Sequence, residues 1–160
     1  MTAPKLRSVT CDRDTAHTMT EEATTPDVVE LTRLAMATIQ RADFGAAYAS
    51  PDIVLDTGGY GMGTFEGRDA AIGFFKDWTS SFEDLIIEAD EILDLGQGVV
   101  LTLYRQEGRP IGASKYVRVR SAMVMLWVDG VIVRNTAYPD IDQARADAER
   151  LAQERAKADV

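Results

Sequence analysis

The residue best suited to chemistry is Asp56, which follows the apolar run 53–55 and precedes a glycine-rich loop at residues 58–63. A carboxylate at the end of a buried strand commonly has one of two uses. It accepts hydrogen bonds from the amides of the following loop, or it borders a cavity and acts there as a general base. We predict Asp56 as the catalytic residue and keep loop anchoring as the alternative.

Three further residues place hydrogen-bonding groups among glycines or apolar neighbours. Tyr60 lies inside the glycine loop, from which its hydroxyl can reach over the mouth of a pocket. Tyr104 and Asn135 lie in apolar, strand-like segments and can direct a hydrogen-bonding group inward. We predict that all three bind substrate. The alternatives are a solvent-edge tyrosine for Tyr60 and a buried amide paired within the protein for Asn135.

Four large apolar residues lie on apolar faces of predicted elements and can form the walls of a pocket. Trp78 lies on a predicted helix, and Met123, Met125 and Trp127 share one face of a predicted strand. Tryptophan supplies apolar area, and the flexible thioether of methionine adapts to different shapes. We predict all four as substrate-binding, with ordinary core packing as the alternative.

The sequence offers no basis for a metal, phosphate or nucleophile site. His17 and Cys11 are the single histidine and the single cysteine, and both lie in the polar segment 1–25. A metal site needs clustered ligands, and a serine or cysteine nucleophile needs a base. The glycine loop also lacks the Lys-Ser/Thr ending of a phosphate-binding loop. We therefore expect no cofactor and no metal.

The charge and the cysteine content limit which partners the protein can have and where it is expected to be located. The chain carries 17 basic and 26 acidic residues, for a formal charge of -9. This charge repels nucleic acids and anionic membranes. With one cysteine an intrachain disulfide cannot form, and the apolar pattern contains neither a secretory leader nor a membrane-spanning run. We expect a cytoplasmic protein without a nucleic-acid or membrane partner.

The length of 160 residues and the 46% hydrophobic content suit one domain. We expect a polar tail at 1–25, one domain at 26–153 and a frayed tail at 154–160. Helical signals begin near residues 25–26, 43, 67–69 and 139–140, and a short strand is expected at 52–56. Further β-rich segments are 85–95, 99–107, 114–128 and 131–138, with a tight Asp129-Gly130 hairpin before the last. This order predicts an α+β domain whose helices cover one face of a strongly bent antiparallel sheet.

The segment 114–128 is apolar on both faces toward its C-terminal end. Met123 and Trp127 share one face, while Ala122, Val124 and Leu126 share the other. A strand of this kind must be covered on both sides. The helices would supply one cover and a second subunit the other, so we expect a homodimer through the outer face of the sheet.

Five short motifs, taken together in order and spacing, resemble a known family. They are residues 43–44, 54–56, 65–72, 129–133 and 138–140. The sequence resembles the nuclear transport factor 2 (NTF2)-like superfamily over about residues 26 to 152, in its SnoaL-like (polyketide cyclase-like) and ketosteroid isomerase-like branch. The resemblance implies a cone-shaped sheet around one hydrophobic pocket, and dimers through the outer sheet face.

The resemblance also implies a pocket for a small hydrophobic organic molecule and cofactor-independent proton transfer, with Asp56 in the position of the base. The partner groups of the relatives do not carry over. Leu34 or Ala35 stands where isomerases keep a tyrosine, Met123 where they keep a second acid, and Ala137 where cyclases and epoxide hydrolases keep an acid. Two interpretations stay open: an isomerase-, cyclase- or dehydratase-type enzyme using Asp56, and a non-catalytic ligand-binding or accessory dimer.

Overall fold

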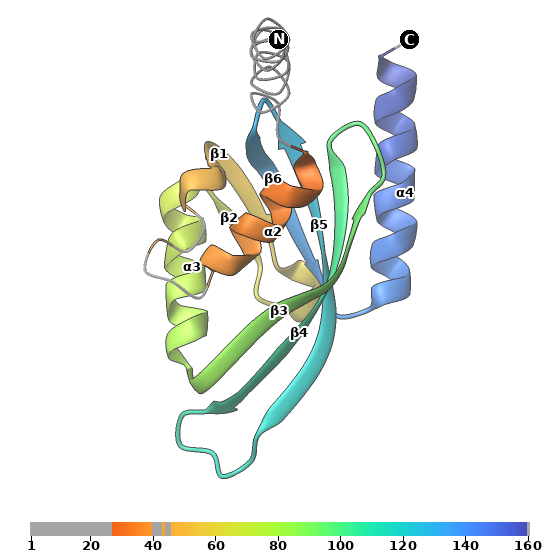
Figure 1. Cartoon of the computed structure of the whole chain (residues 1–160). Coiled ribbons are helices and arrows are strands. Elements are labelled where there is room, and N and C mark those ends of the chain that lie inside the picture. Colours follow the sequence, from red (N-terminus) through yellow and green to blue (C-terminus); the bar gives the residue numbers. More distant parts are fainter. Residues whose placement is uncertain (1–26, 40–42, 44–45, 160) are drawn as a thin grey trace, which may run out of the picture.

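The computed structural model describes residues 27–39, 43 and 46–159 (Figure 1). Its elements are α2 Val28–Thr38, η1 Ala46–Tyr48, β1 Ala49–Asp56, η2 Gly58–Tyr60, β2 Thr64–Glu66, α3 Arg68–Ser80, β3 Phe82–Asp94, β4 Val99–Pro110, β5 Val117–Val128, β6 Val131–Tyr138 and α4 Ile141–Ala158. The predicted tail at 1–25 lies outside the described residues. Within the described part of the chain, no helix is long and apolar enough to cross a membrane.

The strands form one six-stranded mixed sheet in the order β2-β1-β6-β5-β4-β3. Strands β3 to β6 pair antiparallel in sequence order, and β1 joins the sheet by parallel pairing with β6. The predicted α+β class is confirmed. The sheet is antiparallel over β3 to β6, as predicted, but the parallel β1–β6 pair makes it mixed and was not foreseen. Because of this pair, the glycine loop after β1 lies beside the end of β6.

The turns and caps follow from local sequence. The predicted hairpin between β5 and β6 is present, and Asp129 and Gly130 adopt φ values of 52° and 83°, which suit a tight Asp-Gly turn. Helix α2 is capped by Asp27, whose Oδ1 accepts from the amide of Val29 at 3.3 Å. The predicted helix start at Thr25 lies outside the described residues. Of the short helix predicted after Asp43, the structure describes the 3-10 turn η1, and residues 44–45 lie outside the described residues.

Helices cover both faces of the sheet, not one. In Figure 1, α2 and α3 lie on one side of the sheet and α4 lies alone on the other. The first face encloses the core that includes Met123, Met125 and Trp127, and the second carries Val124 against α4. Ala144, Ala148 and Ala152 are buried at four-residue spacing, so α4 can approach the sheet closely. The second cover of β5 is therefore this helix, where the sequence suggested a partner subunit.

Helix α4 also runs on to Ala158, beyond the predicted start of a frayed tail at residue 154. Arg155 explains the extension, since its Nε donates to the carbonyl oxygen of Gln97 at 2.9 Å and ties the last turns to the β3–β4 loop. Arg155 and Lys157 in the last turn also interact favourably with the helix dipole.

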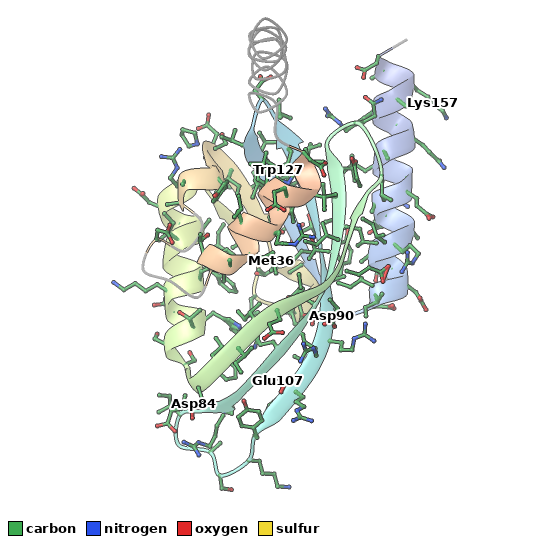
Figure 2. The ribbon with its side chains drawn as sticks, viewed as in Figure 1. Met36, Asp84, Asp90, Glu107, Trp127 and Lys157 are labelled. Atoms are coloured by element: carbon green, nitrogen blue, oxygen red, sulfur yellow. The ribbon has the colours of Figure 1, made fainter. Side chains whose placement is uncertain are left out.

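The part of the outer sheet face beyond α4 is charged. Arg105 on β4 contacts Glu88 at 3.0 Å, Asp90 at 3.1 Å and Glu107 at 2.7 Å. Asp90 and Glu107 lie on the long β3 and β4 strands (Figure 2). Arg118 of β5 joins this cluster through Glu107 at 3.0 Å. The face on which the dimer prediction rests thus carries α4 at one end and a network of ion pairs at the other.

Candidate functional site

A cavity of about 200 Å³ lies on the inner face of the sheet, between α3, strands β3 to β5 and the glycine loop. Its lining comprises Leu55, Thr57, Tyr60, Met62, Phe74, Phe75, Trp78, Phe82, Ile87, Tyr104, Gln106, Val117, Val119, Ser121, Met123 and Ala137. Most of these side chains are apolar and six are aromatic. The composition is that of a site for a small organic molecule.

The aromatic wall comes from α3 and the start of β3. Phe74 and Trp78 are one helical turn apart, and their rings stack with centroids 6.1 Å apart and planes 11° from parallel. Phe82 extends this wall, with its ring tilted 60° from that of Trp78 and the two centroids 5.4 Å apart. Trp78, for which the sequence left core packing as the alternative, therefore lies in a cavity wall together with Phe74 and Phe75.

The opposite wall comes from the inward-facing residues of β4 and β5. Alternation along a strand brings Tyr104 and Gln106 to the same face of β4, and Ser121 and Met123 to the same face of β5. Register pairing places Tyr104 directly opposite Ser121. Two hydroxyl-bearing side chains are thus neighbours on the cavity wall.

Three hydroxyl groups meet there. The Tyr60 hydroxyl donates to Ser121 Oγ at 2.6 Å, across 61 residues of sequence. Tyr104, only 6% exposed, is within hydrogen-bonding reach of both Ser121 and Tyr60. Burial, followed by the neighbouring Tyr60, raises the pKa of Tyr104 well above its ordinary value. Tyr104 therefore remains a neutral phenol, able to donate a hydrogen bond, at any physiological pH.

A second polar pair lies further along the wall, where Trp78 Nε1 donates to Gln106 Oε1 at 3.0 Å. The described residues that line the cavity include no Asp, Glu, His, Lys or Arg. Across the part of the chain that the structure describes, no three His, Cys, Asp or Glu side chains group as a metal site. The chemistry available at the cavity is hydrogen bonding by neutral groups.

Asp56 lies on the other face of β1. Leu55 faces the cavity, so the next side chain along the strand points away from it. Asp56 Oδ1 accepts from the Gly58 amide at 2.9 Å, and Oδ2 pairs with Arg134 Nη2 at 3.0 Å. Together with Tyr138 and residues of α4, Asp56 lines an outer groove of about 230 Å³. These contacts match the loop-anchoring alternative, and a role for Asp56 as a base stays a prediction.

The outer groove also carries polar groups from the end of β6 and the middle of α4. Tyr138 donates to Asp147 Oδ2 at 2.9 Å, and Arg150 pairs with Asp147 at 2.7 Å. Partial burial, then the Asp147 carboxylate, raises the pKa of Tyr138 to about 12. The Asp56 carboxylate adds to this rise in the pKa of Tyr138.

The structure separates the other predicted site residues. Tyr60, Trp78, Tyr104 and Met123 line the cavity, as the sequence suggested. Met125 and Asn135 instead line a chamber of about 30 Å³ next to it.

Trp127 lies beside α2 (Figure 2). Its Nε1 donates to Thr32 at 3.0 Å, and its ring packs edge-on against Tyr48. It belongs to the core and contacts neither cavity.

Sequence reasoning missed Ser121, Gln106 and the phenylalanines of α3 as site residues. A signal for the first two was present, because each lies two positions from a predicted site residue on the same strand face: Gln106 from Tyr104, and Ser121 from Met123. Polar residues at inward positions of an otherwise apolar strand identify the polar part of a pocket.

Comparison with known proteins places the fold. No protein-family model and no curated protein matches the chain. Among solved structures, a protein with a ketosteroid isomerase-like fold from Catenulispora acidiphila, in complex with trimethylamine, is 18% identical. It matches with a TM-score of 0.61 over 71% of this chain and 85% of its own. An NTF2-like protein of unknown function from Burkholderia pseudomallei is 18% identical, with a TM-score of 0.60 over 71% and 91%.

A SnoaL-like protein from Jannaschia sp. CCS1, proposed to be a polyketide cyclase, is 15% identical, with a TM-score of 0.60 over 76% of this chain and 90% of its own. At these identities the likeness shows the fold alone. The fold is NTF2-like α+β, as predicted, and it is shared by ketosteroid isomerase-like and SnoaL-like neighbours.

Proposed function

We propose that this protein binds a small, uncharged, mainly apolar organic molecule in the inner cavity. The observation that carries the proposal is the pairing of an apolar, aromatic wall with a single cluster of neutral hydroxyls at Tyr60, Tyr104 and Ser121. An ion in such a site would be desolvated without a charged partner, which is costly. A neutral molecule with one hydrogen-bond acceptor fits both parts of the lining.

The size of the cavity supports a single-ring ligand. An apolar cavity of about 150 Å³ is enough to bind benzene. The cavity here, at about 200 Å³, has room for a substituted ring or an equivalent aliphatic skeleton. The aromatic wall of Phe74, Trp78 and Phe82 offers ring surfaces against which such a skeleton packs.

The hydroxyl cluster orients the ligand. Tyr60 donates its proton to Ser121, and Ser121 can donate in turn to Tyr104. Tyr104, whose hydroxyl also lies within hydrogen-bonding reach of Tyr60, would turn its proton from Tyr60 to a ligand carbonyl or ether oxygen. Because Tyr104 is buried and neutral, that hydrogen bond forms away from competing water.

Catalysis is the alternative, in the form of a cofactor-free isomerase- or cyclase-type reaction with Asp56 as base. It requires Asp56 to break its contacts with Arg134 and the Gly58 amide. The end of β1 would also have to rearrange until the Asp56 carboxylate faces the cavity. Loss of turnover of an enone substrate in Asp56→Asn, with ligand affinity retained, is the result that would support it. The described contacts of Asp56 favour ligand binding without proton transfer.

A small methylated ammonium ion is a second candidate ligand. Six aromatic side chains line the cavity, and such rings attract alkylammonium cations. The formal charge of -9 also attracts cations to the protein. The structural neighbour from Catenulispora acidiphila, which contains trimethylamine, motivates this comparison.

Calorimetric titration of the full chain with three probes tests the proposal. Acetophenone has a ring and a carbonyl, ethylbenzene lacks the acceptor, and tetramethylammonium is the cation. We expect acetophenone to bind about tenfold more tightly than ethylbenzene, the value of one buried hydrogen bond. In Tyr104→Phe that preference should vanish.

The matched control is Tyr116→Phe, which removes a hydroxyl from an exposed tyrosine outside the cavity lining and should leave the preference intact. If acetophenone does not bind, the proposal is wrong. If tetramethylammonium binds and acetophenone does not, the cation is the ligand class.

A further inference from the structure

Asn135 is a buried amide whose hydrogen bonding is incomplete. It is 4% exposed, and its Nδ2 donates to Met123 Sδ at 3.7 Å. Its Oδ1 accepts no hydrogen bond from any described residue. Buried amide oxygens are normally paired, because an unpaired one loses its hydration without replacement. The oxygen is therefore a free acceptor inside the protein.

The chamber that Asn135 lines has room for a group that could donate a hydrogen bond to this acceptor. Its volume of about 30 Å³ exceeds the roughly 10–15 Å³ that one water-sized group requires. Every other described residue that lines the chamber is apolar, so Asn135 is the polar group available there to an occupant. A hydroxyl or amino group fits both the volume and the acceptor.

The chamber lies against the wall of the larger cavity. Phe75 lines both spaces, and Met123, which accepts from Asn135, lines the larger one. A partly buried phenylalanine and a flexible thioether are the side chains to be displaced between the two spaces. A change of rotamer at Phe75 and Met123 is the movement that would bring the chamber and the cavity together.

We infer that the chamber is a second subsite of the ligand pocket, which accepts the hydroxyl or amino end of the bound molecule. The inference rests on the proposed function and narrows its ligand class. The ligand carries an acceptor at one end, bound by Tyr104, and a hydrogen-bond donor at the other, bound by Asn135 Oδ1. A single ring with a carbonyl and a hydroxyl on opposite sides belongs to this class.

Thr102 provides an internal comparison. Its Oγ1 is also buried without a partner among the described residues, but it lines neither the cavity nor the chamber. Thr102→Val therefore removes an unpaired buried oxygen without touching the proposed subsite. A ligand effect at Asn135 that is absent at Thr102 belongs to the chamber and not to buried polarity in general.

The experiment compares 4-hydroxyacetophenone, 4-methylacetophenone and acetophenone by calorimetry on the full chain. The hydroxyl and methyl groups have similar size, and only the hydroxyl donates. We expect the wild type to prefer the hydroxyl compound over the methyl compound about tenfold. In Asn135→Ala and Asn135→Leu the two should bind equally, while Thr102→Val should keep the full preference.

Acetophenone separates the two possible failures. If acetophenone binds the wild type but the hydroxyl group confers no preference, this inference is wrong and the proposed function stands. If acetophenone itself does not bind, both are wrong.

A crystal structure of the wild type with 4-hydroxyacetophenone decides the matter independently of the variants. The expected result is the hydroxyl within hydrogen-bond distance of Asn135 Oδ1. A water in the chamber, with the hydroxyl elsewhere, would overturn the inference.

Discussion

Leu55 and Asp56 are adjacent in β1, yet they belong to two regions with opposite chemistry. Leu55 lines the inner cavity with aromatic rings and neutral hydroxyls, and Asp56 lines an outer groove with Arg134, Tyr138 and α4. Strand alternation alone separates them. The comparison teaches that the carboxylate most suited to catalysis by type contacts Arg134 and the Gly58 amide, while the cavity on the other face of the strand is lined by uncharged side chains.

The inner region should be far more sensitive to loss of side-chain volume. Leu55 is 1% exposed, and Leu55→Ala should lower the free energy of unfolding by about 2–5 kcal/mol, because it removes buried methyl groups and leaves a void. Urea denaturation measures the change. Ile111→Ala is the control, since Ile111 is 61% exposed and should change stability by less than about 0.5 kcal/mol. Similar losses in the two variants would contradict the assignment of Leu55 to the packed interior.

The outer groove should affect how the stability of the protein changes at alkaline pH. An unfolded tyrosine ionises near 10.0, whereas folded Tyr138 keeps its proton up to about 12. The raised pKa gives stability that is fully present below pH 10 and is lost as the pH rises toward 12. Urea denaturation from pH 8 to 12 should therefore show a steeper decline for the wild type than for Tyr138→Phe.

Tyr116→Phe is the control for this pH series, because Tyr116 is exposed and outside the groove. Its decline should match that of the wild type. Tyr104, whose pKa is also raised, remains in every variant and contributes equally to all of them. Equal slopes for the wild type and Tyr138→Phe would mean that Asp147 and burial do not hold the Tyr138 proton.

The smallest effect is expected at Asp56 itself. Asn in this position still accepts from the Gly58 amide through its carbonyl oxygen and loses only the charge opposite Arg134. The pair is partly exposed, with 27% of the Asp56 side chain and 46% of the Arg134 side chain accessible. Asp56→Asn should therefore lower stability by about 0.2–1 kcal/mol. A double-mutant cycle with Arg134→Gln isolates that ion pair.

The same variant sharpens the comparison of the two regions. If the inner cavity alone binds ligand, Asp56→Asn should leave acetophenone affinity unchanged within about twofold. A tenfold or larger loss of affinity would place Asp56 at the ligand and revive its role as a base.

Strand periodicity and turn chemistry made most of the sheet predictable. Asp129-Gly130 set the last hairpin, and alternation along 114–128 identified the inner face that carries Met123. The parallel pairing of β1 with β6 could not be predicted, because it depends on contacts between segments far apart in sequence. The position of α4 on the opposite face was missed for the same reason.

The site was less predictable than the fold. Tyr60, Trp78, Tyr104 and Met123 were foreseen at the cavity, since residue type and strand face sufficed. Alternation puts Asp56 on the face of β1 opposite Leu55, but which of the two faces borders the cavity depends on how the sheet packs, and the Arg134 partner of Asp56 comes from β6. Sequence spacing within one strand carries no information about such a partner.

A crystal structure of the wild type with acetophenone tests the central claim most directly. The account predicts the ring between β4–β5 and the Phe74–Trp78–Phe82 wall, with the carbonyl oxygen within hydrogen-bond distance of the Tyr104 hydroxyl. Acetophenone bound instead in the outer groove, beside Asp56 and Arg134, would contradict it.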